Sequence, residues 1–98
     1  MSLPLEYLPG VHDEVVEAYR WHENQREGKG EEFLMAVRLG LDAIQENPEG
    51  WAVVFRKVRA YPVKEFLYII YYRILADRIN VVAVQHGHRN PRAWRRRV

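Results

Sequence analysis

The first half of the chain has a pattern of apolar and polar positions that predicts one short strand followed by two helices. Apolar residues alternate over residues 3–8, just before a Pro-Gly pair, which is typical of a short edge strand. From Val11 the apolar residues recur every three or four positions, with Glu14 on the polar side, so an amphipathic helix is expected to end in the glycine-rich segment 26–30. A second helix is expected over residues 31–46, where an Asn-Pro pair stops it.

The second half of the chain is predicted to form strands. Residues 51–59 alternate between two faces and are expected to form one strand. Residues 64–74 are nearly all β-branched or aromatic on both faces, so this strand belongs in the interior of a sheet. A turn at 75–78 leads to a strand at 79–85, which makes the pair an antiparallel hairpin. The tail, residues 90–97, can form one helical turn, and its charge predicts exposure.

The element order β-α-α-β-β-β predicts an α+β fold, in which a helical hairpin packs on one face of a small, mostly antiparallel twisted sheet. A length of 98 residues is consistent with a single domain over residues 1–98. Two helices cannot cover both faces of this sheet, yet residues 66–72 are apolar on both sides. We therefore expect an exposed apolar face rimmed by Arg and Lys, which is typical of a binding surface.

Composition excludes several classes of protein and of site. With 48% hydrophobic and 12% aromatic residues, the chain is too apolar for a disordered tail. The lack of cysteine excludes disulfide scaffolds, thiolate zinc sites and Cys nucleophiles, and it fits a reducing compartment. No apolar run approaches the roughly 18 residues of a membrane span, and the N-terminus does not look like a signal peptide. We therefore expect a cytoplasmic protein with no membrane partner.

The net charge of +2 conceals a strong asymmetry between the halves of the chain. Residues 1–50 carry four basic and eleven acidic residues, a net charge of −7, whereas residues 51–98 carry eleven basic and two acidic residues, a net charge of +9. Such asymmetry favours a basic surface that binds a polyanion or an acidic protein. The alternative is that the two halves neutralise each other across the fold.

The four histidines are candidates for metal ligands and for general acid or base groups. His12 and His22 lie ten residues apart on one predicted helix, which is too far for chelation. His86 and His88 form an H-x-H pair without an apparent third ligand, so we expect no metal and no cofactor. Next to Arg89, either histidine of this pair is a candidate general acid or base. The alternative is a loop histidine that hydrogen-bonds to the backbone.

Basic residues of the second half are expected to converge on the open sheet face and to bind phosphates or carboxylates. They are Arg56, Lys57, Arg59, Lys64, Arg73 and Arg89. The only serine is Ser2, so a serine nucleophile is excluded, and no phosphate-binding Gly-rich motif is present. The remaining enzyme class is metal-free RNA cleavage, in which the 2′-hydroxyl of the substrate is the nucleophile.

The chain resembles the ParE/RelE toxin superfamily of bacterial type II toxin–antitoxin modules, which serve in plasmid stabilisation. The resemblance covers nearly the whole chain and rests on the order of the elements and on three sequence segments. These are Tyr61-Pro62-Val63-Lys64, Ile70-Tyr71-Tyr72-Arg73-Ile74, and His86-Gly87-His88-Arg89-Asn90-Pro91 followed by Trp94. It implies the fold described above and a cognate antitoxin, whose C-terminal segment wraps the toxin in a hetero-oligomer and covers the groove between helices and sheet.

The two branches of the superfamily imply different targets. RelE-like members cleave messenger RNA on the ribosome, whereas ParE-like members inhibit DNA gyrase and are not nucleases. The RelE branch carries an arginine early in the central strand and a tyrosine in the C-terminal element, where this chain has apolar residues 66–70 and Trp94. Because indole cannot act as an acid or base, these differences favour the ParE-like branch. A ribosome-dependent endoribonuclease and an inactive antitoxin-binding relic remain as alternatives.

The resemblance assigns two sets of candidate residues. If the protein is a nuclease, the catalytic candidates are Arg56, Lys57, Arg59 and His88. The candidates for binding the antitoxin or the target are Lys64, Tyr68, Arg73, His86, Arg89, Trp94, Arg95, Arg96 and Arg97.

Overall fold

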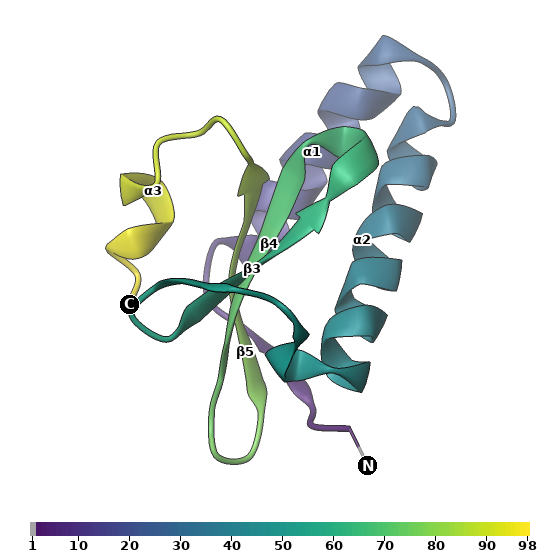
Figure 1. The fold of residues 1–98 in the computed structure, drawn as a ribbon. Helices are drawn as coiled ribbons and strands as arrows, with labels where there is room; N and C mark the ends of the chain where they lie inside the picture. Colours follow the sequence, from purple (N-terminus) through teal and green to yellow (C-terminus); the bar gives the residue numbers. More distant parts are fainter. Residues whose placement is uncertain (1) are drawn as a thin grey trace.

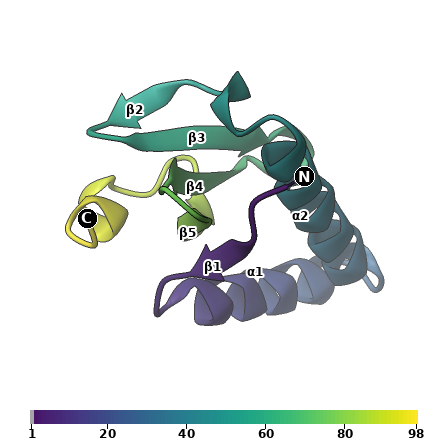
Figure 2. The same ribbon diagram turned by 90° about the horizontal axis from the view of Figure 1, so that it is seen from below.

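The computed structural model describes residues 2–98 and shows one five-stranded sheet between two layers of helix (Figures 1 and 2). In chain order the elements are β1 (Leu5–Tyr7), α1 (Val11–Gln25), α2 (Lys29–Glu46), β2 (Val53–Phe55), β3 (Val58–Val63), β4 (Tyr68–Ile74), β5 (Ile79–His86) and α3 (Arg92–Arg95). Two short 3₁₀ helices, η1 (Pro48–Gly50) and η2 (Lys64–Phe66), join α2 to β2 and β3 to β4. The predicted α+β fold with a helical hairpin on one face is confirmed.

The strands lie in the order β1-β5-β4-β3-β2. β1 pairs parallel with β5, and the other neighbours pair antiparallel, as the sequence predicted for most of the sheet. β4 occupies the centre and forms the predicted hairpin with β5. None of the helices within residues 2–98 has the length and apolar character of a membrane-spanning segment.

The two long helices form a tight hairpin because the chain reverses on glycine. Gly28 precedes α2 with φ of 87°, a left-handed conformation that favours glycine. The carboxylate of Glu23 accepts hydrogen bonds from the backbone N–H groups of Gly28 and Gly30, both at 3.0 Å. A Cβ at Gly30 would lie 2.7 Å from the ring of Tyr19, so this close approach also requires glycine. The end of α1 is thereby fixed to the start of α2.

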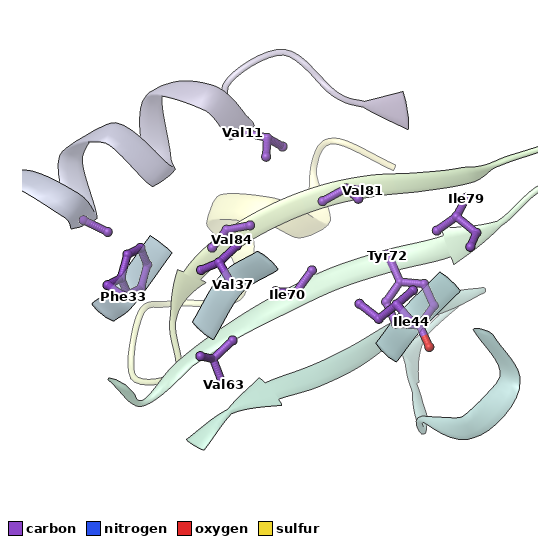
Figure 3. Close-up of a cluster of buried hydrophobic side chains, with 11 residues drawn as sticks. Val11, Phe33, Val37, Ile44, Val63, Ile70, Tyr72, Ile79, Val81 and Val84 are labelled. Atoms are coloured by element: carbon purple, nitrogen blue, oxygen red, sulfur yellow. The ribbon is translucent and has the colours of Figure 1, made fainter. Parts of the chain in front are cut away.

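The main core lies between the helical hairpin and the sheet (Figure 3). Phe33, Val37 and Ile44 of α2 project onto the sheet, where they pack with Ile70 of β4 and with other buried apolar residues. Tyr72 is fully buried at one end of this cluster. Its hydroxyl donates a hydrogen bond to the carbonyl of Pro48 at 2.5 Å, which ties β4 to the segment that follows α2.

The opposite face of the sheet is covered by the C-terminal segment, contrary to the prediction of an open face and an exposed tail. The predicted helical turn exists as α3, but it presents Trp94 to the sheet. The indole is 2% exposed and stacks on the ring of Tyr71, with 4.2 Å between ring centroids and an interplanar angle of 24°. The physical reason is that the central strands are apolar on both faces, so one large aromatic side chain buries what the helical hairpin cannot reach.

The predicted strand 51–59 is wrong, because this segment forms two strands joined by a two-residue turn. Arg56 has φ of 53°, and Phe55 pairs with Val58 across the turn. Positive φ at the first turn residue matches the twist of a hairpin, but arginine gives no sequence signal for it. β3 follows and pairs with β4 along its whole length, including the position of Pro62.

The predicted start of the central strand at Lys64 is also wrong. Lys64 to Phe66 form η2, and Leu67 follows in the left-handed region with φ of 57°. β4 therefore begins at Tyr68, and Leu67 remains 61% exposed at the end of the sheet.

Candidate functional site

A groove of about 580 Å³ lies between α1 and the neighbouring ends of β4 and β5. Its walls include Trp21 and His22 of α1, Phe66 and Tyr68, His86 at the end of β5, and Arg89 in the loop that follows. Three of the predicted binding residues, Tyr68, His86 and Arg89, are thus brought together here. The groove is the larger of the two hollows described in residues 2–98; the other, of about 410 Å³, lies between α2 and β3.

The floor of the groove is aromatic. His22 is 3% exposed, and its ring stacks on Phe33 with 4.7 Å between centroids and meets the edge of Phe66 at 5.2 Å. Its Nδ1 lies 2.7 Å from the carbonyl oxygen of Ala18. A carbonyl only accepts hydrogen bonds, so Nδ1 of His22 is the donor in this contact, which fixes the orientation of the ring.

Tyr68 places a hydroxyl in the wall of the groove. Burial raises the pKa of this hydroxyl above its ordinary value near 10, with Arg89 lowering it and Glu17 raising it as smaller effects. Tyr68 therefore stays protonated at neutral pH, as a hydrogen-bond donor rather than a base. The guanidinium of Arg89 and the carboxylate of Glu17 give the groove charges of both signs next to this donor.

The two loop histidines contact each other and the backbone. The Nδ1 atom of His86 accepts a hydrogen bond from the backbone N–H of His88 at 3.1 Å, and the rings meet edge to face with 5.2 Å between centroids. This is the alternative that the sequence left open for a loop histidine. Within residues 2–98, no group of three or more His, Cys, Asp or Glu side chains is arranged to hold a metal ion.

The edge of β5 beside the groove is open beyond the short β1, which pairs only with residues 79–81 of that strand. Glu14 occupies this edge: its Oε1 accepts from the backbone N–H of Val84 at 3.1 Å, and its Oε2 accepts from the side-chain amide of Gln85 at 2.5 Å. Arg97 reaches the same carboxylate from the opposite face at 2.8 and 3.2 Å, and it also donates to the carbonyl of Val82 at 3.0 Å. We call these contacts the Glu14–Arg97 clamp.

The clamp corrects the predicted placement of Glu14. Glu14 was placed on the solvent side of its helix, yet its side chain is only 10% exposed and points at the sheet edge. Arg97 was a candidate for binding a partner, but its guanidinium is used within the fold. Together with the ion pair between Arg78 and Glu6 at 2.9 Å, the clamp shows that the two oppositely charged halves of the chain neutralise each other in part.

The six basic residues that were expected to converge do not form one site. Arg59 donates to the backbone carbonyls of Trp51 at 2.7 Å and Glu49 at 3.2 Å. Arg73 donates to the side chain of Asn80 at 3.0 Å. The others also lie in different elements: Lys64 at the start of η2, Arg89 in the groove, and Arg56 with Lys57 in the β2–β3 turn.

A second basic surface does form where the β2–β3 turn meets the C-terminal segment, and both views of the ribbon place these segments side by side (Figures 1 and 2). The guanidinium carbon of Arg95 lies 4.7 Å from the ring centroid of Phe55, and that of Arg56 lies 5.2 Å from it. We define the C-terminal basic face as the five exposed basic side chains of these two segments: Arg56, Lys57, Arg92, Arg95 and Arg96.

The sequence analysis did not identify several residues as part of a binding groove. Trp21 is 56% exposed, although a tryptophan is usually well buried, so its place on the polar side of α1 was an available signal. His22 was assigned to the apolar face of the helix and therefore to the core. Phe66 was assigned to a strand, and only the turn at η2 brings its ring to the floor of the groove.

The chain was compared with known proteins in both sequence and structure. No protein-family model matches it. The curated protein Toxin ParE2, in two strains of Mycobacterium tuberculosis, is 27% identical over 97 residues, which is 95% of this chain and 90% of the relative. A solved structure described as a chromosomal ParDE TA system from P. aeruginosa superposes with a TM-score of 0.76 at 10% identity, covering 87% of this chain and 96% of the other. The structural match establishes a shared fold.

Proposed function

We propose that this chain, which resembles ParE toxins in sequence and shares their fold, is the toxin of a type II toxin–antitoxin module and inhibits DNA gyrase. The sequence similarity to Toxin ParE2 extends over 95% of the chain, which supports the toxin assignment. The choice of gyrase as the target rests on the residue that occupies the C-terminal element and on its burial. Trp94 occupies it, is 2% exposed and supports the sheet, so it offers no acid or base to a substrate.

The alternative, a messenger RNA endoribonuclease, has less support from the geometry. Such an enzyme needs an acid, a base and cations around one phosphate. Arg59 faces two carbonyl oxygens, Arg56 lies beside Val98, and His88 is in the loop after β5. These candidates come from different elements and do not line the groove, which gives the nuclease alternative less support.

We assign the groove to the antitoxin. Trp21 and Leu67 stand on its two sides with 56% and 61% of their surfaces exposed, and they offer an apolar partner two large contacts. Lys29, Glu17 and Arg89 supply charges of both signs at the rim. A segment with one apolar side and mixed charges fits this arrangement, and binding it would bury the side chains that the free protein leaves in water.

The proposed function is tested with purified gyrase, relaxed plasmid and purified protein. We expect supercoiling to stop as the protein is added, and to resume when a cognate antitoxin is added in equal amount. A matched reaction contains messenger RNA and translating ribosomes in place of gyrase, and the message should stay intact. Supercoiling that continues at saturating protein would reject the gyrase target, and cleavage of the message would favour the nuclease alternative.

A further inference from the structure

We propose that the C-terminal basic face binds the phosphodiester backbone of nucleic acid. The inference goes beyond the proposed protein target, since it concerns a surface separate from the groove and a ligand of different chemistry. Its members come from two segments that are 35 or more residues apart in sequence, and the fold brings them together at one corner of the sheet (Figure 2).

Two arginines of this face, Arg56 and Arg95, have contacts that hold them in place. Arg95 and Arg56 share the ring of Phe55 as a cation–π partner, at 4.7 and 5.2 Å. Nη1 of Arg56 also lies 3.4 Å from the backbone oxygen of Val98. Phe55 in turn meets the edge of the buried Trp94, with 5.8 Å between centroids. Because these contacts limit side-chain freedom, less entropy is lost when an anion binds.

The face is also not neutralised. Within residues 2–98 the ion pairs involve Arg26, Arg78 and Arg97, and none involves a member of the C-terminal basic face. Five positive charges gathered from these two segments repel one another, and this repulsion opposes folding. A row of phosphates would remove that repulsion and release the counterions that surround nucleic acid.

The chemistry of the face favours phosphate over an acidic protein. Four of its five members are arginine, whose planar guanidinium pairs with phosphate or carboxylate through two parallel hydrogen bonds, so the rest of the surface decides between these ligands. A stable interface with a protein requires an apolar centre, but Trp94 is buried and Phe55 is overlaid by guanidinium groups. Val53 and Val54 are exposed on the neighbouring strand, so an acidic protein is the alternative that the experiment has to separate.

The test measures binding of the purified protein to a labelled DNA duplex of about 20 base pairs by fluorescence anisotropy at several salt concentrations. For three to five phosphate contacts, the logarithm of the binding constant should fall with the logarithm of salt concentration with a slope of about −2.7 to −4.5. Arg92→Gln/Arg96→Gln removes two exposed cations that form no ion pair in residues 2–98, and the slope should become shallower by about 2.

The matched control is Arg20→Gln/Arg38→Gln, which changes the net charge equally on the exposed sides of α1 and α2. It should leave the slope unchanged. An RNA duplex of the same length carries the same number of phosphates, so tighter binding to the RNA duplex or to the DNA duplex identifies the source, and either supports the proposal. Polyglutamate should compete poorly, because its charges are spaced more widely than those of a duplex, which carries one phosphate charge per about 1.7 Å of helix axis.

Three results would overturn the inference: no binding at low salt, an equal loss of binding in the two double variants, or competition by polyglutamate as effective as that by DNA. The last result would assign the face to an acidic protein. The assay contains neither gyrase nor antitoxin. The binding assay can therefore be interpreted even if the protein does not inhibit gyrase. Gyrase inhibition without DNA binding would reject only the inference about the C-terminal basic face.

Discussion

Replacing Glu14 by alanine is expected to destabilise the fold far more than its position near the helix start suggests. The carboxylate is 10% exposed and accepts hydrogen bonds from Arg97, from the backbone of Val84 and from Gln85, which is 2% exposed. Without it, the guanidinium of Arg97 and the amide of Gln85 lose their partner in a partly buried site. The Oε1 atom of Gln85 already has no hydrogen-bond partner, so this amide cannot compensate by turning over.

The magnitude follows from the exposure of the two charges. Removing one partner of a fully buried ion pair costs about 3–5 kcal/mol. Arg97 is 23% exposed and Glu14 is 10% exposed, so water offsets part of that penalty and the expected loss is about 2–3 kcal/mol. For a domain of this size, such a loss lowers Tm by roughly 10–20 °C.

The assay is urea unfolding of Glu14→Ala, Arg97→Ala and the double variant, with Asp13→Ala as the control. Asp13 is an exposed acid in the same helical turn and lacks a hydrogen-bonding role in residues 2–98, so its loss should cost under about 1 kcal/mol through the helix dipole. The cycle should give a coupling energy of about 1–3 kcal/mol between Glu14 and Arg97. A cost for Glu14→Ala no larger than that of Asp13→Ala, or additive effects in the double variant, would refute the clamp.

Three further predictions concern the tail, the groove and the tyrosines. Trp94→Ala should lose about 3–5 kcal/mol in urea unfolding, because it empties a site that is 2% exposed, and a loss below about 1 kcal/mol would mean that the tail is peripheral. Trp21→Ala should weaken antitoxin binding at least tenfold, as measured by isothermal titration calorimetry. Met35→Ala, which changes a side chain that is 58% exposed outside the groove, should not weaken it. Equal effects of the two substitutions would contradict the assignment of the groove to the antitoxin. Burial raises the pKa values of Tyr68, Tyr71 and Tyr72 above 10, so the contribution of these tyrosines to stability should be constant below pH 10 and should be lost as pH rises through their folded-state pKa values. Phenolate absorbance that titrates like that of free tyrosine would contradict this.

The elements with a clear repeat could be predicted from the sequence. The spacing of three and four residues located α1 and α2, and the apolar run of β4 placed it at the centre of the sheet. The turn before β3 could not be predicted, because Arg56 adopts positive φ without the glycine, asparagine or aspartate that usually indicates it. Residues 60–63, which include Pro62, were assigned to no element, yet they pair with β4 as part of β3.

The candidate site was harder to predict because its contacts are not local. Periodicity assigns a side chain to a helix face, but it does not show that β1 ends early and leaves β5 open to Glu14. A tail rich in arginine predicts exposure, and only the apolar second face of β4 explains why Trp94 is buried instead. The structure brings three of the candidate binding residues, Tyr68, His86 and Arg89, to one groove, and their role in binding stays a prediction.

The central claim is tested most directly by inducing the protein in bacteria without an antitoxin, and following growth, plasmid supercoiling and messenger RNA integrity in one culture. The account predicts growth arrest with loss of supercoiling and intact message, and relief of both effects when the antitoxin is co-expressed. Arrest with cleaved message and normal supercoiling would contradict the proposed target. Normal growth at high expression of folded protein would contradict the assignment as an active toxin.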